Sequence, residues 1–373
     1  MSLFSRMLRN TPGYDACLLL VCLFPLLLSG CSSASPAAGQ ARCSTTTSLT
    51  GEGSTFDAPL FDKLFSVYAT TPCGLSVDYY PAGSGMGISM LLGQLADFGA
   101  TDAPLTDRQL ASSSHGTILH IPVTLGLVVI SYHLDGVSVP LKLTSSILAA
   151  IYLGSITMWD DPAIGHLNPG VALPHLAIQV LHRSDGSGTT AIFTHYLASV
   201  SSEWKTRVGA STTVHWPVGQ GEQGNGGIAE ALGNTEGALS YLEWSYVVKL
   251  HLPAALLQNQ AGAFLTPSIE GAQAAAASFP AIPTDLRLYI VNAPGGAAYP
   301  IAGYSWIIVY QQQSDAEKGK ALASLLWWMV HQGQQYAEPL FYAPLPAAMV
   351  NRDEAQVRRL TCGSTHQLCS QGP

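Results

Sequence analysis

Charged residues are scarce in this chain: they make up 11% of its 373 residues, while hydrophobic residues make up 47%. This composition excludes an intrinsically disordered protein, because such chains are rich in charge and poor in hydrophobic residues. Positive charge is the scarcer sign, with 16 Lys and Arg against 24 Asp and Glu and a formal net charge of −8. We therefore expect no nucleic-acid partner, because nucleic-acid-binding proteins carry basic patches.

Long apolar runs are also missing, apart from one at the N-terminus, so the chain is not a polytopic membrane protein. That run extends from Cys17 to Leu28 and follows two positive residues, Arg6 and Arg9. It is short for a bilayer-spanning helix, but it has the length of the apolar part of a signal peptide. We therefore expect residues 1–30 to be a signal peptide, with a retained membrane anchor as the alternative.

The sequence Leu28-Ser29-Gly30-Cys31, which ends the apolar run, is similar to a bacterial lipoprotein box. This resemblance implies cleavage before Cys31 and lipidation of that cysteine, which would anchor the mature chain to a membrane. The residues that follow, 31–48, are small, polar and aperiodic, so we expect a flexible tether there.

Cysteine is scarce in the expected mature chain. Two of the seven cysteines lie in the signal peptide, and a third is the lipidation site Cys31. The remaining four are Cys43, Cys73, Cys362 and Cys369. They allow three pairings, and we favour Cys362–Cys369 with Cys43–Cys73, because the C-terminal two are close in sequence. A zinc site is the alternative, although neither pair has the short spacing usual for zinc ligands.

Common motifs of nucleotide-binding proteins and enzymes are missing too. The chain has no G-x-x-x-x-G-K-[ST] motif, which excludes a P-loop, and no G-x-S-x-G motif. Its 11 histidines include no H-x-x-x-H pair, so a helical zinc site has no support. A G-x-G-x-x-G pattern occurs at Gly219, Gly221 and Gly224, followed by Glu243, but the neighbouring glycines indicate a glycine-rich loop rather than a dinucleotide site.

The body of the chain alternates between strand-like and helix-like segments. Strands are expected over residues 76–80, 119–134, 286–291 and 301–310, and helices over the apolar stripes that start near Pro59, Ile88, Phe193 and Glu317. Such alternation predicts an α/β fold in which helices flank mostly parallel strands. The length suggests two domains. No linker separates them, which indicates that the chain crosses between domains more than once.

Three of the expected helices begin alike, with glycine and hydroxyl residues at 53–56 (GSTF), 83–87 (GSGMG) and 185–190 (DGSGTT). The first N–H groups of a helix have no partner within it, and the helix dipole favours negative charge there. Each serine or threonine can also be an ordinary N-cap. Three such starts in one chain, with Arg183 just before the third, instead predict a shared anion site.

The segments around these helix starts resemble those of the phosphate-binding proteins of bacterial high-affinity phosphate ABC transporters. They occur in family order and are LTGEGSTFDAPLFDKLF (49–65), AGSGMGI (82–88), DFGATDAPLTD (97–107), IYLGSITMWDDPAIGHLNPG (151–170), LHRSDGSGTT (181–190) and GQGEQGNGGI (219–228). The resemblance implies a two-lobed α/β periplasmic-binding-protein fold (type II), with a hinge of two crossovers and ligand in the cleft between the lobes. It implies that residues 49–124 and 298–373 form lobe 1 and that residues 125–297 form lobe 2.

The resemblance also implies the residues that bind inorganic phosphate. They are Thr55, Phe56, Ser84, Asp102, Arg183, Ser187, Gly188 and Thr189, with Asp185 expected to orient Arg183. An ionised Asp102 can accept the O–H group of phosphate, which sulfate lacks at neutral pH, so this carboxylate would exclude sulfate. Glu52 stands where the family has small residues, and we expect it to face solvent.

The family further implies a monomeric protein of the cell envelope, lipid-anchored on the periplasmic or extracellular face, that delivers phosphate to permease subunits. It implies no enzymatic activity, no cofactor and no metal. Two alternatives stay open. A phosphoester hydrolase could use the same anion site, but we find neither a nucleophile paired with a base nor metal ligands. A surface lipoprotein that senses phosphate or adheres is the other alternative.

Overall fold

The computed structural model describes residues 48–137 and 139–369. The expected signal peptide, the lipidation site Cys31 and Cys43 lie outside these residues, so the predictions made for them stay predictions. Within the described ranges, no helix is long and apolar enough to cross a membrane.

A mixed sheet of eight strands forms the centre of the described chain. Its strands are β1 (Ser48–Gly53), β2 (Ser76–Tyr80), β3 (Phe98–Thr101), β4 (Ile118–Tyr132), β6 (Gln179–Arg183), β7 (Gln220–Glu222), β8 (Ala238–Glu243) and β11 (Ala302–Tyr310). They lie in the order β2-β1-β3-β11-β4-β8-β6-β7. At one end β1 pairs in parallel with β2 and β3, and at the other β6 pairs in parallel with β7 and β8. Between them β11 is antiparallel to β3 and β4, and β4 to β8, so the prediction of a mostly parallel sheet is wrong at its centre.

Strand β4 links the two ends of this sheet. All fifteen of its residues are buried, which explains the long apolar run in the sequence. It pairs with β11 up to Leu127 and with β8 from Val128 onward, so its partner changes within one continuous strand. The prediction of a buried strand here is confirmed, as are the strands expected at 76–80 and 301–310.

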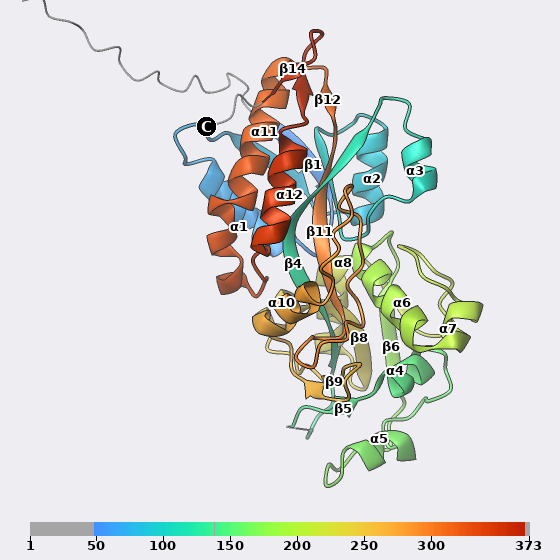
Figure 1. Ribbon diagram of the computed structural model, residues 1–373. Helices are drawn as coiled ribbons and strands as arrows, with labels where there is room; N and C mark the ends of the chain where they lie inside the picture. Colours follow the sequence, from blue (N-terminus) through green and yellow to red (C-terminus); the bar gives the residue numbers. More distant parts are fainter. Residues whose placement is uncertain (1–47, 138, 370–373) are drawn as a thin grey trace, which may run out of the picture. The chain divides into compact units, whose positions relative to one another are not determined.

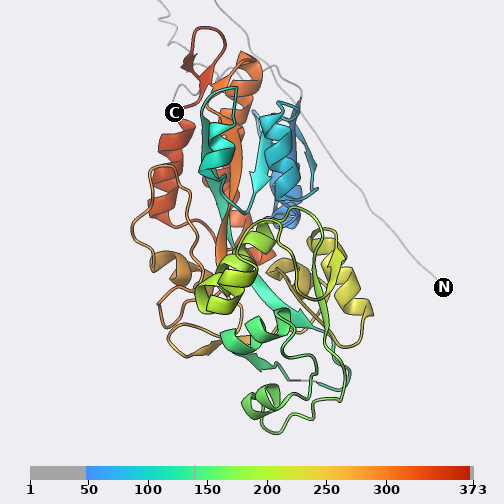
Figure 2. The ribbon, with the colours of Figure 1, turned by 90° about the vertical axis from the view of Figure 1, so that its right-hand side faces the viewer.

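Two groups of helices gather at the two ends of β4 (Figures 1 and 2). One group is α1 (Ala58–Tyr68), α2 (Ser84–Leu92), α3 (Asp107–Ala111), α11 (Ala316–Val330) and α12 (Ala347–Val357). The other is α4 (Ser145–Tyr152), α5 (Pro162–Leu167), α6 (Gly188–Val200), α7 (Ser202–Arg207), α8 (Gly224–Asn234), α9 (Trp244–Lys249) and α10 (Ile269–Ala277). The four helices expected from apolar stripes are thus present as α1, α2, α6 and α11. Segments distant in sequence share the first group, since its blue and its red helices lie together in Figure 1.

Two small sheets and two short 3₁₀ helices complete the fold of residues 48–137 and 139–369. The strands are β5 (Lys142–Leu143), β9 (Leu256–Gln258) and β10 (Phe264–Leu265) in one sheet, and β12 (Gln312–Gln313), β13 (Thr361–Cys362) and β14 (Gln367–Leu368) in the other. The 3₁₀ helices are η1 (Gln332–Tyr336) and η2 (Glu338–Leu340).

The strand expected over residues 286–291 is wrong, because this segment pairs with no strand. Leu286 and Ile290 are fully buried, which accounts for the apolar pattern. Leu286, however, has a φ of 59°, a left-handed conformation that interrupts an extended strand. Its carbonyl accepts a hydrogen bond from the Trp306 indole at 2.9 Å instead of a strand partner. The apolar pattern of residues 286–291 therefore predicted their burial correctly but predicted strand pairing incorrectly.

Strand β4 contains a bulge where it pairs with β11. Ser305 pairs with Thr124 and Trp306 pairs with Pro122, so Val123 is the extra residue of β4 at this point. Proline has no N–H group to donate to the ladder, so regular pairing stops at this point. The residue of β11 at this register shift is Ser305, whose hydroxyl group points to the carboxyl groups of Asp57 and Asp102.

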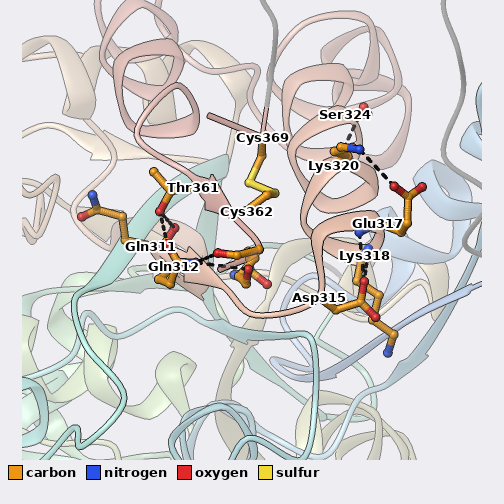
Figure 3. Close-up of a disulfide and its surroundings, with 12 residues drawn as sticks. Gln311, Gln312, Asp315, Glu317, Lys318, Lys320, Ser324, Thr361, Cys362 and Cys369 are labelled. Atoms are coloured by element: carbon orange, nitrogen blue, oxygen red, sulfur yellow. Dashed lines mark hydrogen bonds and ion pairs between the residues drawn. A yellow bond between two sulfur atoms is a disulfide. The ribbon is translucent and has the colours of Figure 1, made fainter. Parts of the chain in front are cut away.

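The predicted Cys362–Cys369 disulfide is present (Figure 3). It joins the last residue of β13 to the residue directly after β14, the strand that pairs with β13. The bond packs tightly on α11, since a Cβ atom at Gly319 would lie 2.4 Å from Cys362 Sγ. Cys73 is also disulfide-bonded, while its predicted partner Cys43 lies outside the described residues.

Removing the C-terminal disulfide with the double substitution Cys362→Ser/Cys369→Ser is expected to lower the free energy of unfolding by about 2 kcal/mol, because the bridge closes a short loop. Urea unfolding followed by circular dichroism measures this change. Ligand affinity is expected to stay the same, because neither cysteine belongs to the site below. An unchanged unfolding midpoint would contradict the stabilising role.

Candidate functional site

Asp102, directly after β3, lies at the centre of a buried polar cluster and is only 1% exposed. Its Oδ1 accepts hydrogen bonds from Ser54 Oγ at 2.5 Å and from Ser305 Oγ at 2.9 Å. Its Oδ2 has only a long contact of 3.5 Å with Ser84 Oγ. One carboxylate oxygen is therefore saturated by hydroxyl donors, and the other keeps free acceptor capacity.

The free oxygen of Asp102 faces the N-terminus of α6. A Cβ atom at Gly188 would lie 2.6 Å from Asp102 Oδ2, so this position requires glycine. The Gly188 N–H group donates to Ser84 Oγ at 3.0 Å, and the Asp102 N–H group donates to the same oxygen at 3.2 Å. Nearby, the Gly85 N–H group donates to the Gly186 carbonyl at 2.7 Å. The second and third predicted helix starts thus meet at Asp102.

Arg183, at the end of β6, is held by a fork of two hydrogen bonds. Its Nε donates to Asp185 Oδ1 at 2.7 Å and its Nη2 donates to Asp185 Oδ2 at 2.5 Å. The Gly224 N–H group also donates to Asp185 Oδ1, at 3.1 Å. Burial alone would raise the pKa of Asp185, but these hydrogen bonds and the charge of Arg183 hold it below its usual value. The expected orienting contact is present, and Arg183 Nη1 remains directed at Thr189 Oγ1, 3.4 Å away.

The first predicted helix start joins the cluster through Thr55. Its Oγ1 accepts hydrogen bonds from the backbone and side-chain nitrogens of Asn225, both at 3.1 Å. Asn225 Nδ2 also donates to Thr189 Oγ1 at 3.0 Å. Asn225 therefore connects two predicted ligand residues that are far apart in the sequence.

Two predicted ligand residues have ordinary structural contacts. Ser187 Oγ accepts from the Thr190 N–H group at 3.0 Å, so it is the N-cap of α6. The Phe56 N–H group donates to Ser54 Oγ at 2.9 Å, and the Phe56 ring packs against Tyr342. Both residues lie in the cluster. The contact of Ser187 is that of an ordinary N-cap residue, which was the alternative to a role in anion binding.

Three carboxyl groups are buried together in this region. Burial raises the pKa of Asp102 to about 6, although the hydroxyl groups of Ser54 and Ser305 and the charge of Arg183 act against that rise. Burial also raises the pKa of Glu243 to about 8, against hydrogen bonds from Ser245. Burial, and then the charge of Asp102, raise the pKa of Asp57 well above its usual value. The site therefore combines one cation with several acids that hold protons readily.

A cavity of about 340 Å³ opens beside the cluster. Its lining includes Thr55, Pro81, Ala82, Gly224 and Tyr246, from both groups of helices and their loops. The Tyr246 hydroxyl group donates to the Thr55 carbonyl at 2.7 Å. Of the predicted ligand residues, Thr55 lines this opening.

Four residues of the cluster were missed by the sequence analysis. Ser54 lies in the first predicted helix start but was not among the predicted ligand residues, and Asn225 lies in the glycine-rich loop that was assigned no role. Its position at the start of α8 makes that loop a fourth helix start, which was the available signal. Asp57 and Ser305 had no signal, because their contact joins residues 248 positions apart.

One group of potential metal ligands occurs among the described residues and contains no site residue. The ligand atoms of His133, Asp135 and Glu236 lie within 4.8 Å of one another. Asp135 and Glu236 are exposed, and exposed acidic groups are common without an ion. This group lies apart from the buried polar cluster around Asp102 and offers no support for a metal there.

The sequence profile of the PBP superfamily domain matches residues 36–330. The phosphate-binding protein PstS of Xylella fastidiosa (strain 9a5c) is 38% identical over 328 residues, which cover 87% of this chain and 88% of that protein. The phosphate-binding protein PstS of Pasteurella multocida (strain Pm70) is 37% identical over 83% of this chain and 89% of its own length.

Solved structures support the fold. A high-affinity periplasmic phosphate-binding protein (PfluDING), solved with bound phosphate, superposes with a TM-score of 0.68 at 19% identity, covering 86% of this chain and 96% of its own. A phosphate-binding protein from Stenotrophomonas maltophilia superposes with a TM-score of 0.62 at 18% identity, covering 83% and 94%. The predicted two-lobed α/β periplasmic-binding-protein fold is confirmed. The chain belongs to the PBP superfamily and, within it, to the family of its PstS relatives.

Proposed function

We propose that the protein binds inorganic phosphate outside the cytoplasm and delivers it to the permease of an ABC-type importer. The names of its PstS relatives support phosphate as the ligand. One observation in the site carries the proposal: an acidic side chain with a free acceptor oxygen, Asp102 Oδ2, lies among groups that otherwise donate. A site for a fully deprotonated anion gains nothing from a carboxylate, whereas a site for a protonated oxyanion does.

The proposed ligand set is the one expected from the sequence. The donors are the hydroxyl groups of Thr55, Ser84, Ser187 and Thr189, the backbone N–H groups of Phe56 and Gly188, and the guanidinium group of Arg183. In the structure several of these donors contact one another. On binding they would exchange these partners for phosphate oxygens, because a buried dianion needs its lone pairs satisfied.

Selectivity follows from the acceptor. Phosphate keeps a proton at neutral pH and can donate it to Asp102 Oδ2, whereas sulfate would present a lone pair to a negative charge. A site that pairs a ligand O–H group rejects an analogue without it by about 10⁴-fold or more. The donors would supply affinity and this single acceptor the selectivity.

Binding would also couple the two lobes, which we place at residues 49–124 with 298–373 and at residues 125–297. Thr55, Ser84 and Asp102 belong to lobe 1 on these boundaries, and Arg183 to Thr189 belong to lobe 2. Contacts made by both lobes at once favour the closed conformation. We propose that the permease recognises the closed conformation. We also propose that the lipid on Cys31 keeps the protein at the membrane. The role is binding, without catalysis.

Calorimetric titration of the purified mature protein at neutral pH tests this function. Phosphate is expected to bind with saturable heat, and sulfate at the same concentration is expected to give none. Equal binding of both anions would contradict the role of Asp102, and turnover of a chromogenic phosphoester would contradict the absence of catalysis.

A further inference from the structure

Asp57 precedes α1 at its N-cap position but does not cap the helix. Its side chain makes no hydrogen bond to the backbone of the first turn, which is the usual contact of an aspartate there. The carboxyl group is instead fully buried. Its Oδ2 contacts Ser305 Oγ, and its Oδ1 has no hydrogen-bond partner in the part of the chain that the structure describes.

The hydroxyl group of Ser305 lies between two carboxyl groups. Its oxygen contacts Asp57 Oδ2 and lies 2.9 Å from Asp102 Oδ1, with the Thr101 carbonyl as a more distant third acceptor at 3.3 Å. A serine hydroxyl group has one hydrogen, and ionised carboxylates only accept. One hydrogen cannot serve both carboxylates, so one of the two carboxyl groups must itself hold a proton.

The surroundings of the two carboxyl groups place that proton on Asp57. Asp102 has further stabilisation for a negative charge, from the Ser54 hydroxyl group and from Arg183. Asp57 shares both of its nearby hydroxyl groups with Asp102: Ser305 contacts both carboxyl groups, and Ser54, which also acts to lower the pKa of Asp57, donates its hydrogen to Asp102. The ionisable groups that act on it are all acids, and an acid nearby favours the protonated form. They are Asp102 after β3, Glu243 at the end of β8, Tyr79 of β2, Tyr246 of α9 and Tyr342 after η2.

We propose that Asp57 is a positioning residue of the anion site: its protonated carboxyl group donates to Ser305, Ser305 donates to Asp102 Oδ1, and Asp102 Oδ2 is thereby reserved for the ligand O–H group. This inference rests on the proposed phosphate-binding function. The chain of contacts lies at the register shift between β11 and β4, where Ser305 contacts both carboxyl groups. Loss of the proton would reverse the Ser305 hydroxyl group toward Asp57 and leave two adjacent negative charges.

The first test is infrared spectroscopy of the protein without added phosphate. Wild-type protein at neutral pH is expected to show the C=O stretch of a buried protonated carboxylic acid that is missing in Asp57→Asn. Asp353 of α12 provides the matched control, because it is buried, both of its oxygens lack partners among the described residues, and burial raises its pKa as well. Asp353→Asn should remove a different band. A spectrum that Asp57→Asn leaves unchanged overturns the proposal.

The second test is phosphate affinity by calorimetry from about pH 5 to about pH 10. As the pH rises through the pKa of Asp57, the wild-type affinity is expected to fall by about tenfold or more relative to Asp57→Asn, which cannot ionise. The titration of phosphate itself is common to both proteins and cancels in this ratio. Asp353→Asn is expected to follow the wild type throughout.

The outcomes distinguish a failure of the Asp57 role from a failure of phosphate binding. Wild-type protein that binds phosphate with the same pH profile as Asp57→Asn overturns the role of Asp57 alone. Wild-type protein that binds no phosphate at any pH overturns the proposed function, and the role of Asp57 with it.

Discussion

Replacing Arg183 with alanine is expected to weaken phosphate binding by about 3 kcal/mol or more, which corresponds to at least about a hundredfold in the dissociation constant. The Arg183 side chain is 1% exposed, so its charge acts without screening by water. The substitution would also leave the Asp185 carboxylate without its partner beside the anion. Loss of attraction and gain of repulsion therefore act in the same direction.

Calorimetry at neutral pH measures this effect, with circular dichroism to verify folding. Arg207→Ala is the matched control, because Arg207 lies on α7 in an exposed ion pair with Glu203, and its removal should not alter binding. Arg183→Lys keeps the charge but loses the two-pronged contact with Asp185, so an intermediate affinity is expected. Binding by Arg183→Ala within threefold of the wild type would remove Arg183 from the site.

Much of the fold was predictable because its elements have local causes. All residues of strand β4 are buried, so its sequence is one continuous apolar run. Helix α11 has an apolar stripe along its length. The antiparallel centre of the sheet was not predictable, because strand direction depends on partners distant in sequence. The error at residues 286–291 has the same origin: buried side chains and paired backbone produce similar patterns, and only tertiary structure separates them.

The residues of the candidate site also differ in whether a local sequence signal indicates them. Arg183 and Asp185 are two residues apart, and the helix starts at Ser84 and Gly188 carry glycine and hydroxyl signals of their own, so sequence alone indicated them. Ser305 carries no such signal. It lies beside Asp102 at a register shift where β11 pairs with β4, a strand that is distant in sequence. An individual serine in an apolar strand gives no indication of such a contact.

Replacing Asp102 with asparagine is expected to reduce the preference for phosphate over sulfate by about a hundredfold or more. The hydroxyl groups of Ser54 and Ser305 both donate at the Oδ1 position, so they would hold the amide oxygen there. The amide NH₂ group would then occupy the Oδ2 position and donate toward the ligand. Sulfate, which offers only lone pairs, would gain a donor where it previously met a negative charge.

The two dissociation constants, measured by calorimetry for wild type and variant, give this ratio. Asp97→Asn serves as control, because Asp97 pairs with Lys318 outside the cluster and should not affect selectivity. An unchanged ratio in Asp102→Asn would contradict the acceptor role.

Acidification is expected to reproduce the Asp102→Asn effect in the wild-type protein. The pKa of Asp102 is raised to about 6, so the carboxylate is ionised above that pH and protonated below it. A protonated Asp102 donates instead of accepting, and sulfate itself stays unprotonated over this range. Sulfate affinity should therefore rise in the wild type as the pH falls through about 6 and stay constant in Asp102→Asn, because only the wild type has a group at this position that titrates. Parallel profiles in the two proteins would show that the proton on Asp102 does not control which anion is bound.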